Sequence, residues 1–330
     1  TRDGVSLGYN LYFRETDYGE FNVANYLTNS SGFGAQFGYP ISDITRLGFN
    51  ITYDKTDIDI GSLPAREIYD FVSVEGNIFE TLSAQLSWQR VTLNRGLFPT
   101  DGASTVLSVS STIPGSDLSY YRLNVRQRYY QPLTQNLVFG FQGELGYLDA
   151  YGDTEETPFF QNFYAGGPRS LRGFESNTLG PRSTDAPCYE FNYEEGTCPN
   201  LLDTDGDGEL DAPYYNPYAN QTSRYRDAPI GGNIKIEGSL QLIFRLPFIE
   251  DQRSLRSAFF FDFGNVFSDN CKDYQINCSE PSVDDLRYSY GVGLTWITGF
   301  GPMSLAIAKP TNAGPRERTE EFQFTVGNVF

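Results

Sequence analysis

The acidic segment from residue 203 to residue 211 has side chains whose types and spacing suit the binding of a divalent cation. Counted from Asp203, carboxylates occupy positions 1, 3, 5 and 9 and a glycine occupies position 6, as in the first part of a calcium-binding loop. Position 12, where such a loop needs a bidentate carboxylate, is Tyr214. Two interpretations stay open: a calcium site formed by Asp203, Asp205, Asp207 and Asp211, or a solvated acidic turn.

Four cysteines form two local pairs, Cys188 with Cys198 and Cys271 with Cys278, and polar, loop-forming residues flank each pair. The spacing suits disulfides that close loops in an oxidising compartment, and it differs from the C-x-x-C of metal and redox sites. Unpaired thiols are the alternative.

Histidine is absent from the 330 residues of the chain. Its absence excludes Ser-His-Asp and Cys-His catalysis and the usual zinc sites. The sequence also lacks a P-loop and a dinucleotide-binding fingerprint. We therefore expect no enzymatic activity and no nucleotide or redox cofactor. The formal net charge of -18 argues against nucleic acid as a partner.

Hydropathy alternates with a period of two over much of the chain. Between Ile234 and Leu246 one face is apolar, and the other carries Lys235, Glu237 and Gln241. The same alternation recurs at residues 5–13, 47–53, 121–128, 137–147, 288–296 and 303–307. We count roughly a dozen such strands, most near the about 9 to 11 residues that a tilted membrane strand needs. No run of about 18 apolar residues is present, which excludes a helical membrane protein.

The alternation predicts an all-β fold, and two observations favour a transmembrane antiparallel β-barrel over a soluble β-sandwich. The polar face includes charges that a dry core could not solvate, and aromatic residues gather near the strand ends as in an interfacial girdle. An open sheet edge in hydrocarbon would leave backbone groups unsatisfied, so the barrel must close. We expect residues 1–330 to form one barrel domain, with residues 151–232 as a long inserted loop.

That loop is roughly 80 residues long, far beyond an ordinary hairpin connection. Within it, residues 163–181 set Leu171-Arg172-Gly173-Phe174 between two glycine-rich bends. This stretch resembles the signature of the BamA family of outer-membrane barrel assembly factors. Further segments that match blocks of the family are residues 95–102, 113–116, 259–267 and 299–302. The resemblance covers nearly the whole chain.

The resemblance implies a barrel of about sixteen strands, of which this chain holds about twelve. It places Thr1 shortly before the fifth strand of the family, so that POTRA domains and about four strands would precede the chain. It further implies a bacterial outer-membrane location, with unfolded outer-membrane proteins as clients. Accessory outer-membrane lipoproteins, outer-membrane lipid and lipopolysaccharide are the other implied partners.

In the BamA family the long loop folds back into the barrel lumen, and the arginine of its motif pairs with acidic groups on the inner wall. The resemblance assigns that role to Arg172. Strand phase puts Asp262 on the face opposite Phe259 and Phe261, hence toward the lumen. Asp262 is therefore the expected partner, since a bidentate pair fixes geometry as well as charge.

At one position the sequence departs from the family. Where many relatives carry a second glutamate on the inner wall, this chain has Gln241. Glu237, four residues earlier on the same face, is the expected substitute. An alternative interpretation of Arg172 is that it caps a tight turn at Gly173.

The C-terminal segment resembles the outer-membrane β-signal that assembly factors recognise: Phe322, Phe324, Val326 and Phe330 alternate with polar residues. Gly327 matches a family glycine at which the last strand can kink and unpair, because glycine weakens a strand interior. The implied mechanism is non-enzymatic, with an incoming client strand adding to the edge exposed at a lateral seam.

Two alternatives to an insertase of outer-membrane proteins stay open. One is a related superfamily member, such as a TamA-like factor or a two-partner secretion transporter. The other is a diffusion porin, which the polar inner face and the acidic loops favour and the folded-back motif loop opposes.

Overall fold

The computed structural model describes residues 4–21, 24, 26–60, 65–184, 228–247, 249, 254–275, 278–299 and 301–327. Within these ranges, a 12-stranded sheet has the order β1-β2-β3-β4-β5-β6-β7-β9-β10-β11-β12-β14. Its strands are β1 (Ser6–Asp17), β2 (Tyr26–Ser42), β3 (Thr45–Ile60), β4 (Ile78–Val91), β5 (Gly102–Thr112), β6 (Tyr120–Thr134), β7 (Leu137–Ala150), β9 (Ile234–Phe244), β10 (Leu255–Phe267), β11 (Arg287–Thr298), β12 (Gly301–Pro310) and β14 (Phe322–Val326). Neighbouring strands are antiparallel throughout. The prediction of an all-β chain with about twelve strands is confirmed.

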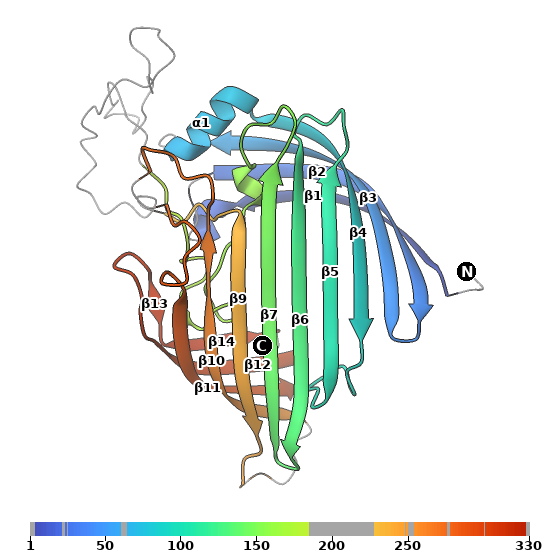
Figure 1. The fold of residues 1–330 in the computed structure, drawn as a ribbon, viewed down its shortest axis with the longest axis vertical. Helices are drawn as coiled ribbons and strands as arrows, with labels where there is room; N and C mark the ends of the chain where they lie inside the picture. The colour runs from blue at the N-terminus through green and yellow to red at the C-terminus, as the bar shows by residue number, and fades with distance from the viewer. Residues whose placement is uncertain are drawn as a thin grey trace.

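The sheet curves into the wall of a barrel, with β1 and β14 at its two edges (Figure 1). Apolar side chains stand exposed on its outer face at every second residue, as a lipid-facing surface requires. They include Leu7, Tyr9, Leu11 and Phe13 of β1, Phe259 and Phe261 of β10, and Phe322 and Phe324 of β14. A 2-stranded sheet pairs the short strands β8 (Gly173–Phe174) and β13 (Thr319–Glu320).

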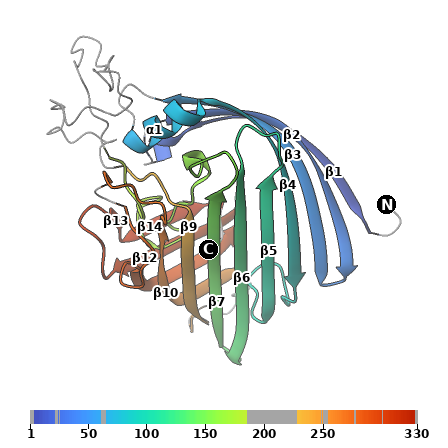
Figure 2. The same ribbon diagram turned by 45° about the horizontal axis from the view of Figure 1, so that its top comes forward.

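The two ends of the barrel wall differ in the length of their connections. At one end, residues 43–44 join β2 to β3 and residues 135–136 join β6 to β7. The other end carries the helix α1 (Arg66–Glu75), which is seen in Figure 2. The 3-10 turns η1 (Tyr18–Phe21) and η2 (Phe159–Gln161), the latter in the described start of the long loop, belong to connections at the same end. Outer-membrane barrels have short periplasmic turns and longer extracellular loops, so the short-turn end is the periplasmic one.

Strands β2 and β3 have 17 and 16 residues, which is longer than the sequence pattern predicts. The additional residues lie at the extracellular end, where Tyr26 and Ile58 are buried in one cluster with Ile68 and Phe71 of α1. The longer strands therefore extend beyond the membrane and support the helix.

Helix α1 is fastened to the loops around it through its first residues. The Glu67 carboxylate accepts hydrogen bonds from the backbone N–H of Thr184 at 3.1 Å and from the Gln275 amide at 3.3 Å. The guanidinium of Arg66 lies 3.9 Å from the centre of the Tyr274 ring. Burial raises the pKa of Glu67 above its ordinary value. In the part of the chain that the structure describes, no helix is long and apolar enough to cross a membrane.

Candidate functional site

The described start of the long loop folds back against the inner face of the sheet. Phe163 forms a β-bridge with Gly232, just before β9 begins. Leu171 and Phe174 are both 0% exposed, and they belong to one apolar cluster with Leu148 of β7 and Val266 of β10. Because Leu171 and Phe174 are both buried against the wall, Arg172 and Gly173 between them are held at the inner wall as well.

Arg172 forms a bidentate ion pair with Asp262 in the middle of β10. Its Nε and Nη2 atoms donate to the two carboxylate oxygens at 2.7 Å each, and its backbone N–H donates to Oδ2 at 3.2 Å. Arg172 is 5% exposed and Asp262 0%. The structure thus places Arg172 against the expected inner-wall carboxylate, in an environment where losing either partner would leave a buried charge uncompensated.

Three further residues fit the guanidinium into the wall. Arg172 Nη2 also donates to the Ser239 hydroxyl of β9 at 3.0 Å. The Arg172 Cζ atom lies 3.5 Å from the centre of the Phe260 ring, which stacks the cation on an aromatic face. A Cβ atom on Gly293 of β11 would lie 3.5 Å from Arg172 Nη1, which is ordinary van der Waals contact, so β11 borders the guanidinium at this position.

The two other predicted inner-wall partners lie on β9. Gln241 is buried and donates from Nε2 to the Ser239 hydroxyl at 3.2 Å, so it touches Arg172's hydrogen-bond partner. Glu237 accepts a hydrogen bond from the hydroxyl of Ser170 and pairs with Lys235 at 3.0 Å. Glu237 therefore holds the motif loop two residues before Arg172, while Ser239 takes the place on the guanidinium that we expected Glu237 to fill.

Gly173 lets the loop turn from the wall toward the last strand. Its φ of +90° belongs to the left-handed region, and a Cβ atom there would lie 3.2 Å from the Ala308 side chain. The two residues of β8 then pair with β13, just before β14. Gln323 of β14 completes the connection: its amide donates to the Phe174 carbonyl at 2.8 Å and accepts from the Gly173 N–H at 3.4 Å.

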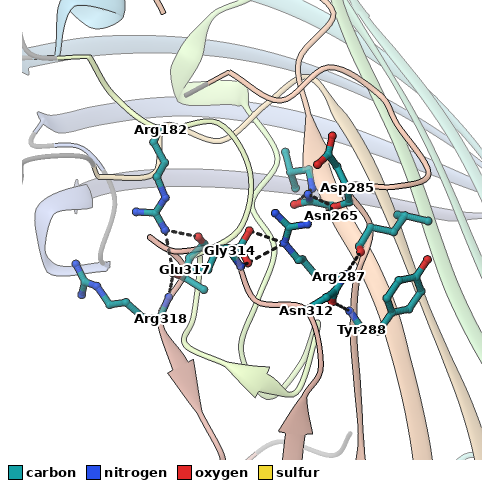
Figure 3. Close-up of polar contacts among 12 residues, drawn as sticks. Arg182, Asn265, Asp285, Arg287, Tyr288, Asn312, Gly314, Glu317 and Arg318 are labelled. Atoms are coloured by element: carbon teal, nitrogen blue, oxygen red, sulfur yellow. Dashed lines mark hydrogen bonds and ion pairs between the residues drawn. The ribbon is translucent and has the colours of Figure 1, made fainter. Parts of the chain in front are cut away.

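The connection between β12 and β14 is fixed on its extracellular side as well (Figure 3). Arg287 at the start of β11 donates from Nε to both carboxylate oxygens of Glu317, at 2.7 and 2.8 Å. Asn312 bonds to the backbone of β11 at Tyr288. On the other side, the Arg318 N–H donates to the hydroxyl of Thr178 in the motif loop at 2.9 Å. The motif loop, β11 and the approach to β14 form one hydrogen-bonded unit.

The predicted seam residues lie on β14. Phe322, Phe324 and Val326 are exposed on the outer face, and Gln323 between them is 2% exposed. Strand β14 has 5 residues against 10 in β12, its neighbour. Gly327 follows with a φ of +85°, so the chain bends directly after the strand. Phe330 lies outside the described residues.

Other predicted site residues lie away from this unit. Cys271 and Cys278 form a disulfide in the connection between β10 and β11, as predicted. Cys188, Cys198 and the acidic residues Asp203, Asp205, Asp207 and Asp211 lie outside the described residues. Among the residues described, no cluster of His, Cys, Asp or Glu has the makings of a metal site.

Sequence reasoning did not single out Ser239, Phe260 or Gln323. Phe260 was open to inference, because it shares the inward phase of Asp262 and precedes it by two residues. The sequence has no comparable signal for Ser239, whose residue type is common on polar strand faces. Nor does it have one for Gln323, whose partner in the motif lies 149 residues away.

Fold and site together define a membrane β-barrel whose inner wall holds a folded-back arginine motif. The chain belongs to the Omp85 superfamily, whose domain model matches residues 1–330. It is 28% identical to outer membrane protein assembly factor BamA of Neisseria meningitidis over 100% of this chain and 40% of that protein. It is 22% identical to the human sorting and assembly machinery component 50 homolog, over 85% of this chain and 51% of that protein.

The crystal structure of BamA from Haemophilus ducreyi lacking POTRA domains 1–3 has the same fold. It matches with a TM-score of 0.79 and 27% identity, over 100% of this chain and 60% of that one. The chain thus spans about half the length of the relatives that it matches. The resemblance to BamA inferred from the sequence is confirmed, and the chain is an integral protein of the bacterial outer membrane.

Proposed function

We propose that this chain is the membrane barrel of an outer-membrane protein assembly factor, which folds and inserts β-barrel clients at a seam beside β14. Its similarity to BamA, an outer membrane protein assembly factor, supports the proposal. The observation that carries it is the link from the buried Arg172–Asp262 pair through Gly173 and Phe174 to Gln323 of β14. A passive pore has no need of a luminal loop that holds its edge strand.

The edge of the wall at β14 is suited to strand exchange. The strand is half as long as its neighbour β12, and Gly327 bends the chain directly after it. A short strand is held by few ladder hydrogen bonds, so its edge is available for pairing with another chain. An incoming client strand that adds to this edge gains backbone hydrogen bonds without any covalent step. We therefore propose a non-enzymatic mechanism without a nucleotide or redox cofactor.

The motif loop is proposed to keep that edge in register while client strands exchange. Gln323 is bonded to the loop on the inner face, whereas Phe322 and Phe324 face the lipid. The loop is in turn anchored on β9 and β10 by Ser239 and Asp262. Losing Arg172 would free the loop, and β14 would then lose the contact that positions it.

The test uses the full-length parent protein in liposomes, with an outer-membrane barrel client added from urea. The rate at which the client becomes protease-resistant is compared for wild type, Arg172→Ala and Arg169→Ala. Arg169 is exposed in the same loop and serves as the matched control. We expect acceleration by wild type and by Arg169→Ala, and its loss in Arg172→Ala. A wild-type rate no higher than that of empty liposomes would refute the assembly function.

A further inference from the structure

The connection from β10 to β11 contains a small closed loop, residues 271–278, which we call the disulfide loop. The disulfide between Cys271 and Cys278 closes it. Just outside the disulfide, the backbone N–H of Ser268 donates to the Ser279 carbonyl at 2.8 Å. Both ends of the loop are therefore tied together, and it stands on the extracellular ends of two wall strands.

Two side chains of the disulfide loop contact the first turn of α1. The ring of Tyr274 stacks under the guanidinium of Arg66, whose Cζ atom lies 3.9 Å from the ring centre, so the two form a cation–π contact. Gln275 bonds in two directions: its side-chain oxygen accepts the Lys272 N–H at 2.8 Å, and its Nε2 atom donates to the Glu67 carboxylate at 3.3 Å. The turn inside the loop thus orients Gln275 toward the helix.

The described start of the long loop takes part in the same contact. The Lys272 ammonium of the disulfide loop pairs with the Glu156 carboxylate. Helix α1 binds the long loop further along, where the Arg66 N–H donates to the Thr184 carbonyl at 2.9 Å. The disulfide loop, α1 and the long loop therefore meet at one place outside the barrel wall.

This contact joins parts of the wall that are not neighbours. Helix α1 lies between β3 and β4 in the chain, and the disulfide loop lies between β10 and β11. In the sheet, β5, β6, β7 and β9 separate β4 from β10. The contact must offset the conformational freedom that the two connections lose in making it. A cross-link within one of them removes part of that freedom in advance.

We propose that the disulfide loop is a redox-sensitive clasp, in which the Cys271–Cys278 bond holds Tyr274 and Gln275 in place to bind α1 and, through α1, the long loop. Both cysteines are partly exposed at the extracellular end, so a small dithiol reaches them from solution. Exchange with the dithiol breaks the S–S bond, leaves two cysteine thiols and converts the reagent to its cyclic disulfide. The clasp then opens, while the motif loop stays on the inner wall. The inference goes beyond the proposed function and does not depend on it.

The test measures native-state hydrogen exchange in the full-length parent protein in detergent micelles. The Arg66 amide reports on the contact between α1 and the long loop, and the Tyr69 amide reports on α1 itself. The Glu175 amide, in the motif loop, is the internal reference. The parent carries Cys188→Ser and Cys198→Ser, which leaves one cysteine pair in this chain.

Three changes to this parent are compared. The first is Cys271→Ser with Cys278→Ser, the second is reduction of the folded protein by dithiothreitol, and the third is Tyr274→Ala with Gln275→Ala. Reduction acts on a protein that has already folded, so it separates the clasp from any effect of the serines on folding. Asp273→Ala is the matched control, because Asp273 is exposed in the same loop and has no contact with α1 among the described residues.

We expect exchange at the Arg66 and Tyr69 amides to become about tenfold faster or more after each of the three changes, and the chain entropy of so short a loop sets the upper end at roughly fifty-fold. Exchange at Glu175, and all exchange in Asp273→Ala, should stay as in the parent. Unchanged exchange at Arg66 without the disulfide would show that the bond does not hold the clasp. Unchanged exchange after removal of the Tyr274 and Gln275 side chains would show that they do not hold α1. Equal acceleration at Glu175 would show a general loosening of the barrel, which also overturns the inference.

Discussion

Replacing Arg172 by methionine should detach the motif loop from the inner wall. Asp262 is 0% exposed, and the substitution removes both 2.7 Å hydrogen bonds to its carboxylate. Breaking a buried pair from one side costs about 3–5 kcal/mol, because the remaining charge is uncompensated. The equilibrium constant for loop opening should then rise roughly 150- to 4,000-fold.

Native-state hydrogen exchange at backbone amides measures this constant. The Glu175 N–H donates to the Arg318 carbonyl, so its exchange reports on the contact between the motif loop and the approach to β14. The Ala308 N–H donates to the Glu321 carbonyl, so its exchange reports on the contact between β12 and that approach. In Arg172→Met we expect faster exchange at both amides, and in Arg169→Met wild-type exchange.

The double variant Arg172→Met with Asp262→Leu tests the physical reason. Removing both charges also removes the uncompensated carboxylate, so much of the protection should return. Wild-type exchange in the single variant would show that the ion pair does not hold the loop. A double variant as open as the single one would show that the buried charge is not the cause.

The other predictions concern the glycine of the motif, the β12–β14 connection and helix α1. Gly173→Ala puts a Cβ atom on a residue whose φ is +90°, at 3.2 Å from the Ala308 Cβ. The strain should destabilise the docked motif loop by roughly 1–3 kcal/mol and speed hydrogen exchange at the Glu175 amide. Gly152→Ala, in an open turn, should leave exchange at that amide unchanged. Glu317→Gln removes the negative charge from the largely buried ion pair between Glu317 and Arg287. The connection from β12 to β14 should loosen, so limited proteolysis between residues 311 and 318 should become faster. Glu280→Gln, at an exposed position, should leave the rate of proteolysis there unchanged. Burial raises the pKa of Glu67, so the folded state binds its proton more tightly, and the stability that this proton contributes is lost as pH rises through the raised pKa. The protection factors of the α1 amides, which correct for the intrinsic pH dependence of exchange, should rise on acidification from neutral pH in wild type and change less in Glu67→Gln.

Alternation along the sequence was sufficient to place one member of the site. The pattern from Phe259 to Phe263 assigns Asp262 to the inner face, and the structure has its side chain there, fully buried. A period of two is a local property of the chain, so it can be seen without knowledge of the fold. The number of strands was open to prediction for the same reason.

Contacts between distant segments of the chain could not be predicted from the sequence. Glu237 and Gln241 lie on the same face of β9, so the strand pattern alone makes either a possible partner of Arg172. In the structure Ser239 binds Arg172 and Glu237 binds Ser170, because the position along β9 at which the motif loop makes contact selects the partners. The position of the motif loop along β9 depends on how Leu171 and Phe174 pack against β7 and β10. The extra length of β2 and β3 depends likewise on the docking of α1, which no strand pattern encodes.

The bond between Phe174 and Gln323 closes a segment of 149 residues, and this has a consequence for how the protein itself folds. The entropy lost in joining two such distant points grows with the logarithm of the separation and amounts to roughly 4 kcal/mol here. Strands β9 to β12 lie within that segment and pair with their sequence neighbours at a lower entropic cost. The hairpins should therefore form first, and the meeting of loop and last strand should be a late step. An intermediate with the motif loop still outside would expose both β8 and β14 to foreign strands, so the newly made chain needs protection for as long as that step lasts.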